Sequence, residues 1–454
     1  MAISLIQKYN VAGPRYTSYP TVPYWDNLSF SNEKWIESLQ KSFAESNHSE
    51  GISIYIHLPF CESLCTFCGC HKRITKRHEV EIPYVDAVLK EWKLYLDILG
   101  ERPLIKEAHL GGGTPTFFKP KELKRLLEGI FGTAEIAENK AFSFEGHPNN
   151  TTGEHLQTLF DLGFDRVSYG VQDYSPKVQK AIHRIQPFSN VEKVTEWARE
   201  IGYKSISHDL VFGLPFQTLE DVLFTIDKTN QLRPDRIAFY SYAHVPWIKG
   251  NGQRGFDESN LPSGDEKRLL YETGKKHLLD AGYAEIGMDH FSLPSDSMYK
   301  SFESNNLHRN FMGYTASKTQ VMIGLGMSAI SDSWYGFAQN EKDLDAYYAR
   351  IERNEIPVFR GHILNEEDLI IRKHILNLMC HFNTSWEESS MYFPEIENVT
   401  RRLSEMVSDD LIRIVDKKIE VTNAGKPFVR NVCMAFDLRL QRNIPNTKIF
   451  SMTV

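Results

Sequence analysis

Between residues 52 and 281 the sequence alternates between short apolar segments typical of strands and longer segments with helical spacing of apolar residues. The expected strands are 52–57, 108–110, 141–145, 166–171, 205–212 and 236–242. The expected helices are 83–99, 121–131, 153–162, 176–183 with 190–201, 219–232 and 264–281. This alternation predicts a parallel sheet with right-handed crossovers. Because a closed barrel of this class needs more strand–helix units, the six seen here predict an α/β fold with an open, partial (β/α)6 barrel.

The flanking segments follow a different pattern. Residues 1–50, with one expected helix at 33–45, are too short for a core of their own and predict an N-terminal arm lying on the main body. We expect residues 51–290 to form the barrel, and 291–364 to form a barrel extension and connection. Within these regions we expect a strand at 285–291 and a glycine-interrupted apolar stretch at 320–330.

Residues 365–454 predict a mostly helical C-terminal domain with a β wing. Its expected elements are helices at 366–383, 396–409 and 423–437 and a hairpin of 411–415 with 418–421. A winged-helix DNA-binding domain is the alternative, but no basic recognition helix is visible. We therefore expect this domain to be a lid over the barrel mouth.

Composition excludes several classes of protein. The 454 residues carry a net charge of −7, and no Lys/Arg-rich run indicates a basic groove, so we expect no nucleic-acid partner. Met1–Tyr9 lacks a cleavage-like site, and no apolar run is long enough for a membrane span, so a cytoplasmic location is expected. There thiols stay reduced, and Cys380 and Cys433 are expected to be buried structural thiols.

Four of the six cysteines, Cys61, Cys65, Cys68 and Cys70, fall within ten residues. Zinc normally takes two pairs of ligands, and a second pair is missing from the sequence. The spacing C-x3-C-x2-C suits a [4Fe–4S] cluster held by three thiolates. Three thiolate ligands leave one iron without a protein ligand, so this iron is open to a substrate or a cofactor.

The cysteine spacing is similar to that of the radical S-adenosylmethionine (SAM) enzymes, and other motifs narrow the resemblance. In their order along the chain they resemble the oxygen-independent coproporphyrinogen III oxidase (coproporphyrinogen dehydrogenase, HemN) family. The motifs are Tyr16-Thr-Ser-Tyr-Pro20, Tyr55-Ile-His-Leu-Pro-Phe60, Cys68-Gly-Cys70, Gly111-Gly-Gly-Thr-Pro115, Gly170-Val-Gln-Asp173, Gly213-Leu-Pro215, Gly287-Met-Asp-His-Phe291 and His308-Arg-Asn-Phe311. The resemblance covers the chain from Tyr16 almost to its C-terminus and implies the partial (β/α)6 barrel.

The resemblance also implies the site residues. Cys61, Cys65 and Cys68 match the ligands of the cluster, and Glu145 matches a residue that binds one SAM molecule. The positions that match the site of a second SAM molecule are Gln172, Arg184, Asp209 and Ala243, and further SAM contacts are implied for Tyr55, Phe67, Gly112, Gly113, Thr114 and Ile330. Without the resemblance, a helix cap is the alternative for Glu145 and a tight turn the alternative for the glycine run, while Gln172, Arg184 and Asp209 read as ordinary surface polar residues.

The family places Cys70 outside the cluster's ligand set, near the second SAM, and we expect Cys70 and Tyr55 to be catalytic. The alternatives for Cys70 are a spare thiol and a substitute ligand. Because only Gly69 separates them, Cys68 and Cys70 are expected to point apart. Haem-carrying relatives typically lack this cysteine, so its presence favours the oxidase.

Two histidines depart from the family pattern. His147 stands where many relatives have aspartate, and His208 stands where an apolar residue is common. We expect both to lie near the barrel mouth as packed or solvated side chains, without a catalytic role. Arg309 and Arg15 are candidate anchors for carboxylates of the substrate.

The function implied by the resemblance is the anaerobic conversion of two propionates of coproporphyrinogen III to vinyl groups, giving protoporphyrinogen IX in haem biosynthesis. The implied cofactors are a [4Fe–4S] cluster and two SAM molecules. We expect an electron donor such as flavodoxin or ferredoxin, and a monomer. The alternatives are a haem-binding or haem-transfer protein on the same scaffold and a haem-cleaving radical SAM methyltransferase.

Overall fold

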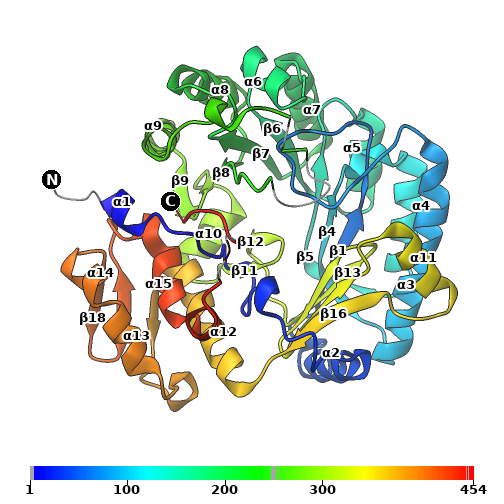
Figure 1. The fold of residues 1–454 in the computed structure, drawn as a ribbon. Helices are drawn as coiled ribbons and strands as arrows, with labels where there is room; N and C mark the ends of the chain where they lie inside the picture. The colour runs from blue at the N-terminus through cyan, green and yellow to red at the C-terminus, as the bar shows by residue number, and fades with distance from the viewer. Residues whose placement is uncertain (1–4, 247–251, 254, 446, 448, 454) are drawn as a thin grey trace.

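A twelve-stranded sheet forms the centre of the molecule (Figure 1). The structure, a computed structural model, describes residues 5–246, 252–253, 255–445, 447 and 449–453, so residues 1–4 of the expected arm lie outside it. Six consecutive parallel strands are β1 (Ile52–Leu58), β4 (Leu104–Gly112), β5 (Glu135–Gly146), β6 (Arg166–Gln172), β7 (Ser205–Phe212) and β8 (Arg236–Ser241). They are the six predicted strands, although β4 and β5 are longer than expected because they begin before the apolar stretch.

Helices follow each of these strands and cover the outer face of the sheet (Figure 1). They are α3 (Glu81–Leu99), α4 (Pro120–Phe131), α5 (Gly153–Asp161), α6 (Pro176–Ala181) with α7 (Phe188–Ile201), α8 (Leu219–Leu232) and α9 (Gly264–Asp280). Capping boxes at Thr152, Thr218 and Ser263 begin three of them. The main core lies between sheet and helices, where Trp92 and Phe144 are fully buried.

The sheet continues past both edges of the six-stranded unit without closing. Beside β1 lie the parallel β13 (Val321–Leu325) and then the antiparallel β14 (Ile330–Ser333), β15 (Gly336–Asn340) and β16 (Val358–Ile363). Beyond β8 lie β10 (His290–Ser292) and β9 (Ala284–Gly287). Since β16 and β9 are the two ends of the strand order, the predicted open barrel is confirmed.

Shorter elements connect these parts. They are β2 (Phe60–Cys61), β3 (Arg73–Ile74), α10 (Ser297–Glu303), β11 (His308–Asn310), β12 (Gly313–Thr315), α11 (Leu344–Glu352) and the 3-10 helices η1 (Val22–Tyr24), η2 (His78–Val80), η3 (Pro115–Phe117), η4 (Glu258–Asn260), η5 (Ser389–Met391) and η6 (Lys426–Phe428). The single strand expected at 285–291 is wrong. The chain reverses there between β9 and β10, and Asp289 adopts a φ of 66° in the turn.

The C-terminal region is mostly helical and lies beside the barrel (Figure 1). It contains α12 (Glu366–His381), β17 (Asn383–Ser385), α13 (Ile396–Arg402), α14 (Ser404–Ser408), β18 (Ile412–Val415), β19 (Lys418–Val421), α15 (Val429–Phe436) and α16 (Leu438–Arg442). The hairpin is confirmed, with β17 as a third strand. The helix expected at 396–409 is divided at Leu403, and the one expected at 423–437 is shortened to α15, because η6 precedes it.

The N-terminal arm contacts two parts of the molecule. Its helix α2 (Asn32–Ser46) packs on β13–β16 and buries Trp35 completely. Ahead of it, α1 (Leu5–Tyr9) and the following turn place Tyr9, Tyr16 and Tyr19 in the core of the C-terminal region. The arm therefore ties the C-terminal region to the barrel extension. The domain boundaries at residues 50, 290 and 364 stay predictions, and β10 crosses the second of them.

In the part of the chain that the structure describes, no helix is both long and apolar enough to cross a membrane.

Candidate active site

The four clustered cysteines lie on a loop that follows β1. The loop is closed by parallel pairing of β2 with β3, and the Thr75 amide donates a hydrogen bond of 2.9 Å to the Cys61 carbonyl. Within it, the Cys68 amide donates to the Cys65 carbonyl at 3.3 Å. All four thiols are free, and all four residues line one cavity of about 440 Å³ at the carboxyl ends of the parallel strands.

This cavity collects most of the predicted site residues. Those that line it are Cys61, Cys65, Phe67, Cys68, Cys70, Gly112, Gly113, Thr114, Glu145, Gln172, Arg184 and Asp209. They come from β2, β4, β5, β6 and β7, from the cysteine loop, and from the segments that follow β4 and α6. Since side chains at the carboxyl ends of parallel strands meet at one edge of the sheet, the sequence pattern was sufficient to group them. Asp209 differs from the others, because it lies inside β7, three residues before the end of the strand.

The chemistry of the donor set fits the implied cluster. Among the described residues no three His, Cys, Asp or Glu side chains converge on a single metal ion. A cuboidal cluster instead takes one thiolate on each of three irons, so its ligands are spread around a larger body. Lining one cavity as free thiols, Cys61, Cys65 and Cys68 match that requirement. The Arg184 guanidinium lies 3.8 Å from the Cys65 sulfur.

The glycine loop after β4 packs directly on the cysteine loop. A Cβ atom on Gly112, whose φ is 113°, would lie 2.7 Å from the His57 ring, and one on Gly113 would lie 2.5 Å from the Pro59 carbonyl oxygen. The Gly113 amide donates to the Leu58 carbonyl at 2.8 Å. These glycines are thus required for contact between two loops, a reason that the sequence did not reveal.

Glu145 faces the cavity from β5 and has two partners. Its Oε1 lies 3.6 Å from Nε2 of His109, and the Gly112 amide donates to its Oε2 at 3.2 Å. Burial favours the neutral acid, but the hydrogen bond and charge of His109, together with the Gly112 amide, outweigh it and lower the pKa of Glu145. The side chain is still 47% exposed, so an ionised carboxylate is presented to a ligand.

His109 was not singled out from the sequence. Ser143 lies 2.8 Å from its Nδ1, and the Tyr55 ring stacks on it with centroids 6.0 Å apart. The signal was present, because alternation in the expected strand 108–110 puts His109 on the same side as Gly111, at the carboxyl end of that strand. His109 and Tyr55 thus form the wall that orients Glu145.

Arg184 and Asp209 bring opposite charges to the far side of the cavity. Arg184 donates to the Gly170 carbonyl at 2.6 Å, while its buried Nε has no hydrogen-bond partner among the described residues. Burial raises the pKa of Asp209 to about 7, although Ser168 donates to it at 2.9 Å. Buried polar groups normally have hydrogen-bond partners, and the Nε of Arg184 lacks one. Together with the raised pKa of Asp209, this indicates a binding surface at which a ligand supplies the missing partner.

Three predicted residues do not line this cavity. Tyr55 lies just beneath it, with its hydroxyl 3.1 Å from His57 Nδ1. The Ala243 carbonyl accepts from Gln253 at 3.1 Å, and the same amide donates to the Phe67 carbonyl at 2.9 Å, so Gln253 connects two positions implied for SAM. Ile330 instead packs at the start of β14 in a cluster with Trp25 and Phe337.

The expectation that Cys68 and Cys70 point apart is wrong. Their thiols interact with each other, which lowers the pKa of Cys68 to about 6 and raises that of Cys70 well above its ordinary value. The bend after Gly69 turns the second thiol back towards the first. Cys70 nevertheless lines the cavity, so its functional role stays a prediction.

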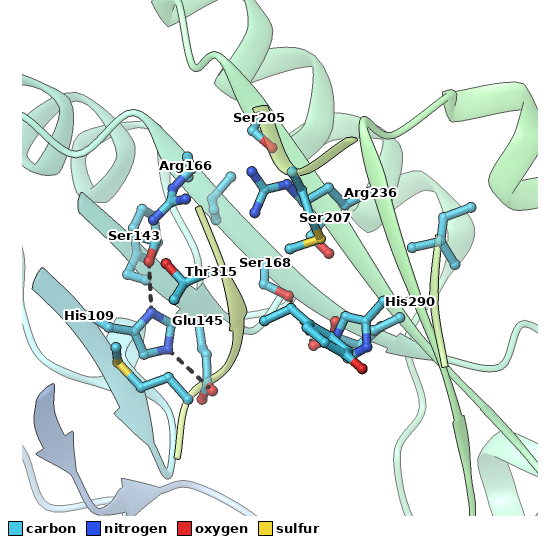
Figure 2. A pocket seen from close by; sticks show the side chains of 18 of the residues that line it. His109, Ser143, Glu145, Arg166, Ser168, Ser205, Ser207, Arg236, His290 and Thr315 are labelled. Atoms are coloured by element: carbon cyan, nitrogen blue, oxygen red, sulfur yellow. Dashed lines mark hydrogen bonds and ion pairs between the residues drawn. The ribbon is translucent and has the colours of Figure 1, made fainter. Parts of the chain in front are cut away.

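A second cavity, of about 150 Å³, lies in the barrel interior (Figure 2). Glu145, Asp209 and Tyr240 line both cavities. Figure 2 shows polar side chains on all sides of the second one, among them Ser143, Ser168, Ser207, Thr315, Arg166 and Arg236. Barrel interiors are usually filled by branched apolar side chains, so a hollow polar interior reserves space for a ligand.

The two histidines that depart from the family pattern have different places. His147 lines the cavity that contains the cysteines. Burial, together with the positive charge of Arg184, lowers the pKa of His147 to about 2. His208 is fully buried at 0% exposure, 3.1 Å from Thr195 on α7, so its expected place near the mouth is wrong. Side chains alternate along a strand, and with Asp209 facing inward, its neighbour His208 must face the helices.

Both arginines suggested as carboxylate anchors make contacts in the structure, although the buried Nη1 of Arg309 has no hydrogen-bond partner among the described residues. Arg309 donates to the carbonyls of Tyr16 and Arg15 at 3.3 and 3.4 Å, and Arg15 forms an ion pair with Asp289. Arg309 is only 5% exposed. Both therefore hold the N-terminal arm in place.

A partial (β/α)6 barrel whose first loop presents three cysteines beside a glycine loop is the architecture of a radical SAM enzyme. Residues 55–229 match the family model described as "Radical SAM superfamily". The chain is 38% identical over 444 residues to the oxygen-independent coproporphyrinogen III oxidase of Helicobacter pylori strain J99, with 96% of each chain covered. It is 34% identical over 450 residues to the Escherichia coli K12 protein of that name, covering 97% of this chain and 96% of the relative.

The fold agrees with these relationships. The solved structure of the coproporphyrinogen III oxidase HemN from Escherichia coli, described as a radical SAM enzyme, superimposes with a TM-score of 0.87 and 32% identity over 93% of this chain and 97% of that one. The chain belongs to the oxygen-independent coproporphyrinogen III oxidase family and is an enzyme.

Proposed function

We propose that this enzyme converts two propionates of coproporphyrinogen III to vinyl groups without oxygen, giving protoporphyrinogen IX. The observation that carries the proposal is the single cavity in which three free thiols, a glycine loop and Glu145 meet, in a chain of this family. When bound, a reduced [4Fe–4S] cluster and SAM would supply a 5′-deoxyadenosyl radical able to take a hydrogen atom from a propionate β-carbon, and loss of CO2 with transfer of one electron to an external acceptor would then leave the vinyl group.

The chain's own residues bind and orient the reactants. Cys61, Cys65 and Cys68 are proposed to hold the cluster. The Glu145 carboxylate accepts from the ammonium or ribose hydroxyl groups of SAM, and His109 keeps that carboxylate ionised and in place. The polar barrel interior below Glu145 gives a carboxylate-bearing arm of the substrate room next to the reacting centre.

We propose a second SAM site at Gln172, Arg184, Asp209 and Ala243, next to Phe67. It is supported by the unpaired Nε of Arg184, which needs an acceptor. A one-electron donor such as flavodoxin or ferredoxin, action as a monomer, a C-terminal lid and a cytoplasmic location complete the proposal.

Anaerobic incubation of the reconstituted enzyme with coproporphyrinogen III, SAM and a reductant tests the proposal. Chromatography with mass detection is expected to show the divinyl product and 5′-deoxyadenosine. Unchanged substrate with bound haem would favour a haem-transfer protein, and a methylated or ring-opened product would favour a methyltransferase.

Replacing Cys70 separates its three interpretations. We expect Cys70→Ser to keep the iron and SAM binding but to lose porphyrinogen oxidation, because the thiol lies in the cavity without being needed as a ligand. Iron, SAM cleavage and product are measured on one preparation. Full product formation would show that the thiol is spare, and loss of iron would show that Cys70 is a ligand.

A further inference from the structure

A basic segment lies on the surface directly beside the cysteine loop. Residues 71–79 contain Lys72, Arg73, Lys76 and Arg77 against the single acid Glu79, a net charge of +3 with histidine neutral. The whole chain carries −7, so this segment has the opposite sign to the molecule as a whole. A local field of this kind orients an approaching charged partner.

Strand pairing fixes the distance between this segment and the cysteines. In the parallel pair of β2 and β3, Arg73 is opposite Phe60, and Ile74 is opposite Cys61. Paired strands are about 4.8 Å apart, so a partner resting on β3 would lie one strand away from Cys61. Lys72 donates to the carbonyls of Cys68 and Cys70, each at 3.3 Å, and thereby ties the segment to the other side of the same loop.

Three charges of this segment, those of Arg73, Lys76 and Arg77, are exposed, whereas Lys72 is held against the cysteine loop. Lys76 and Arg77 are exposed, and within the described residues neither side chain has an ion-pair partner. Arg73 pairs with Asp343 at 2.8 Å, but both side chains are largely exposed, and such pairs contribute little. The nearby acid Glu62 lies 3.9 Å from His78.

The surface also offers apolar contact. Ile74 is 46% exposed in the middle of the basic segment, and Leu64 of the cysteine loop is 39% exposed. An apolar centre with a charged rim is the usual composition of a protein interface. A small anion would need no such apolar centre, so this composition fits a protein partner.

We infer that the segment Lys72–Arg77 with Ile74 is the docking surface for an acidic protein that delivers single electrons to the cluster. The inference rests on the proposed function, since the reaction needs a one-electron reductant. The net negative charge of the chain repels an acidic carrier protein, whereas the basic segment attracts it. Binding at this segment would place the redox group of the carrier next to the cysteine loop.

The test compares two double variants that change the net charge equally. Lys76→Glu/Arg77→Glu reverses the proposed surface, and Arg413→Glu/Lys417→Glu reverses two exposed basic residues on the C-terminal hairpin. Calorimetry under nitrogen measures the affinity of the cluster-loaded chain for an acidic flavodoxin at low and at physiological salt. Stopped-flow absorbance measures how fast the reduced flavodoxin and, separately, dithionite reduce the cluster.

We expect the first variant to bind flavodoxin about tenfold more weakly or worse, with a flatter salt dependence, while the hairpin variant stays within about twofold of the unaltered chain. Dithionite, a small reductant, should reduce both variants at the unaltered rate. Equal binding by the first variant, equal losses in both variants, or no flavodoxin binding by the unaltered chain would overturn the inference. Coproporphyrinogen is absent from these measurements, so failure of the proposed function would leave their result unaffected.

Discussion

Alanine at Cys61, Cys65 or Cys68 is expected to abolish the brown chromophore that anaerobic reconstitution with iron and sulfide produces. On the proposed assignment each thiol supplies one of three protein ligands of the cluster, and a cluster with two remaining ligands is readily lost. Iron and sulfide analysis with the visible spectrum measures the effect, and all SAM cleavage should disappear with it.

Cys380→Ala is the matched control, because Cys380 is 2% exposed in a core cluster with Ile286 and Met298 and does not line the cavity. It should keep the iron content of the unaltered chain. Unaltered iron content in all three cavity variants would refute the ligand assignment.

Glu145→Ala and Asp209→Ala are expected to weaken SAM binding while leaving the fold and the cluster intact. Loss of a hydrogen bond to a charged group costs about 2 kcal/mol, which is roughly a thirtyfold loss of affinity. The effect should be larger for Glu145, which is already ionised through His109. Calorimetry under nitrogen gives affinity and stoichiometry, and Glu128→Ala, on the exposed face of α4, is the control.

The pH dependence distinguishes the two carboxylates. With a pKa of about 7, Asp209 is neutral below that pH and negative above it. Since SAM carries a cationic sulfonium, its affinity should rise between about pH 6 and pH 8, and Asp209→Asn should remove that rise. Unchanged affinity and stoichiometry in the alanine variants at every pH would contradict the assignment of both residues.

The order of strands and the grouping of the site could be predicted because both follow from local patterns. Apolar strand segments followed by helical spacing define the parallel unit, and that unit brings Gly112, Glu145 and Gln172 to one edge. The resemblance added the roles of individual residues, such as Arg184, which comes from a loop after β6 and has no local signal.

The failures have specific physical causes. The turn between β9 and β10 has Asp289 rather than a glycine at its positive φ of 66°, so residues 285–291 did not indicate two strands. His208 was expected at the barrel mouth because the alternation of side chains along the strand was not considered. With Asp209 facing inward, its neighbour His208 faces the helices. The basic segment at 72–77 is interrupted by Ile74 and Thr75, and its importance comes from pairing between β2 and β3, which the sequence does not show.

The most direct test of the central claim follows one hydrogen atom. Coproporphyrinogen III deuterated at the propionate β-carbons is incubated anaerobically with the reconstituted enzyme, SAM and reductant, and the 5′-deoxyadenosine is analysed by mass spectrometry. The proposed function predicts deuterium in 5′-deoxyadenosine together with formation of the divinyl product, and neither with the Cys61→Ala variant. Unlabelled 5′-deoxyadenosine accompanying full product formation would contradict hydrogen abstraction from the β-carbon.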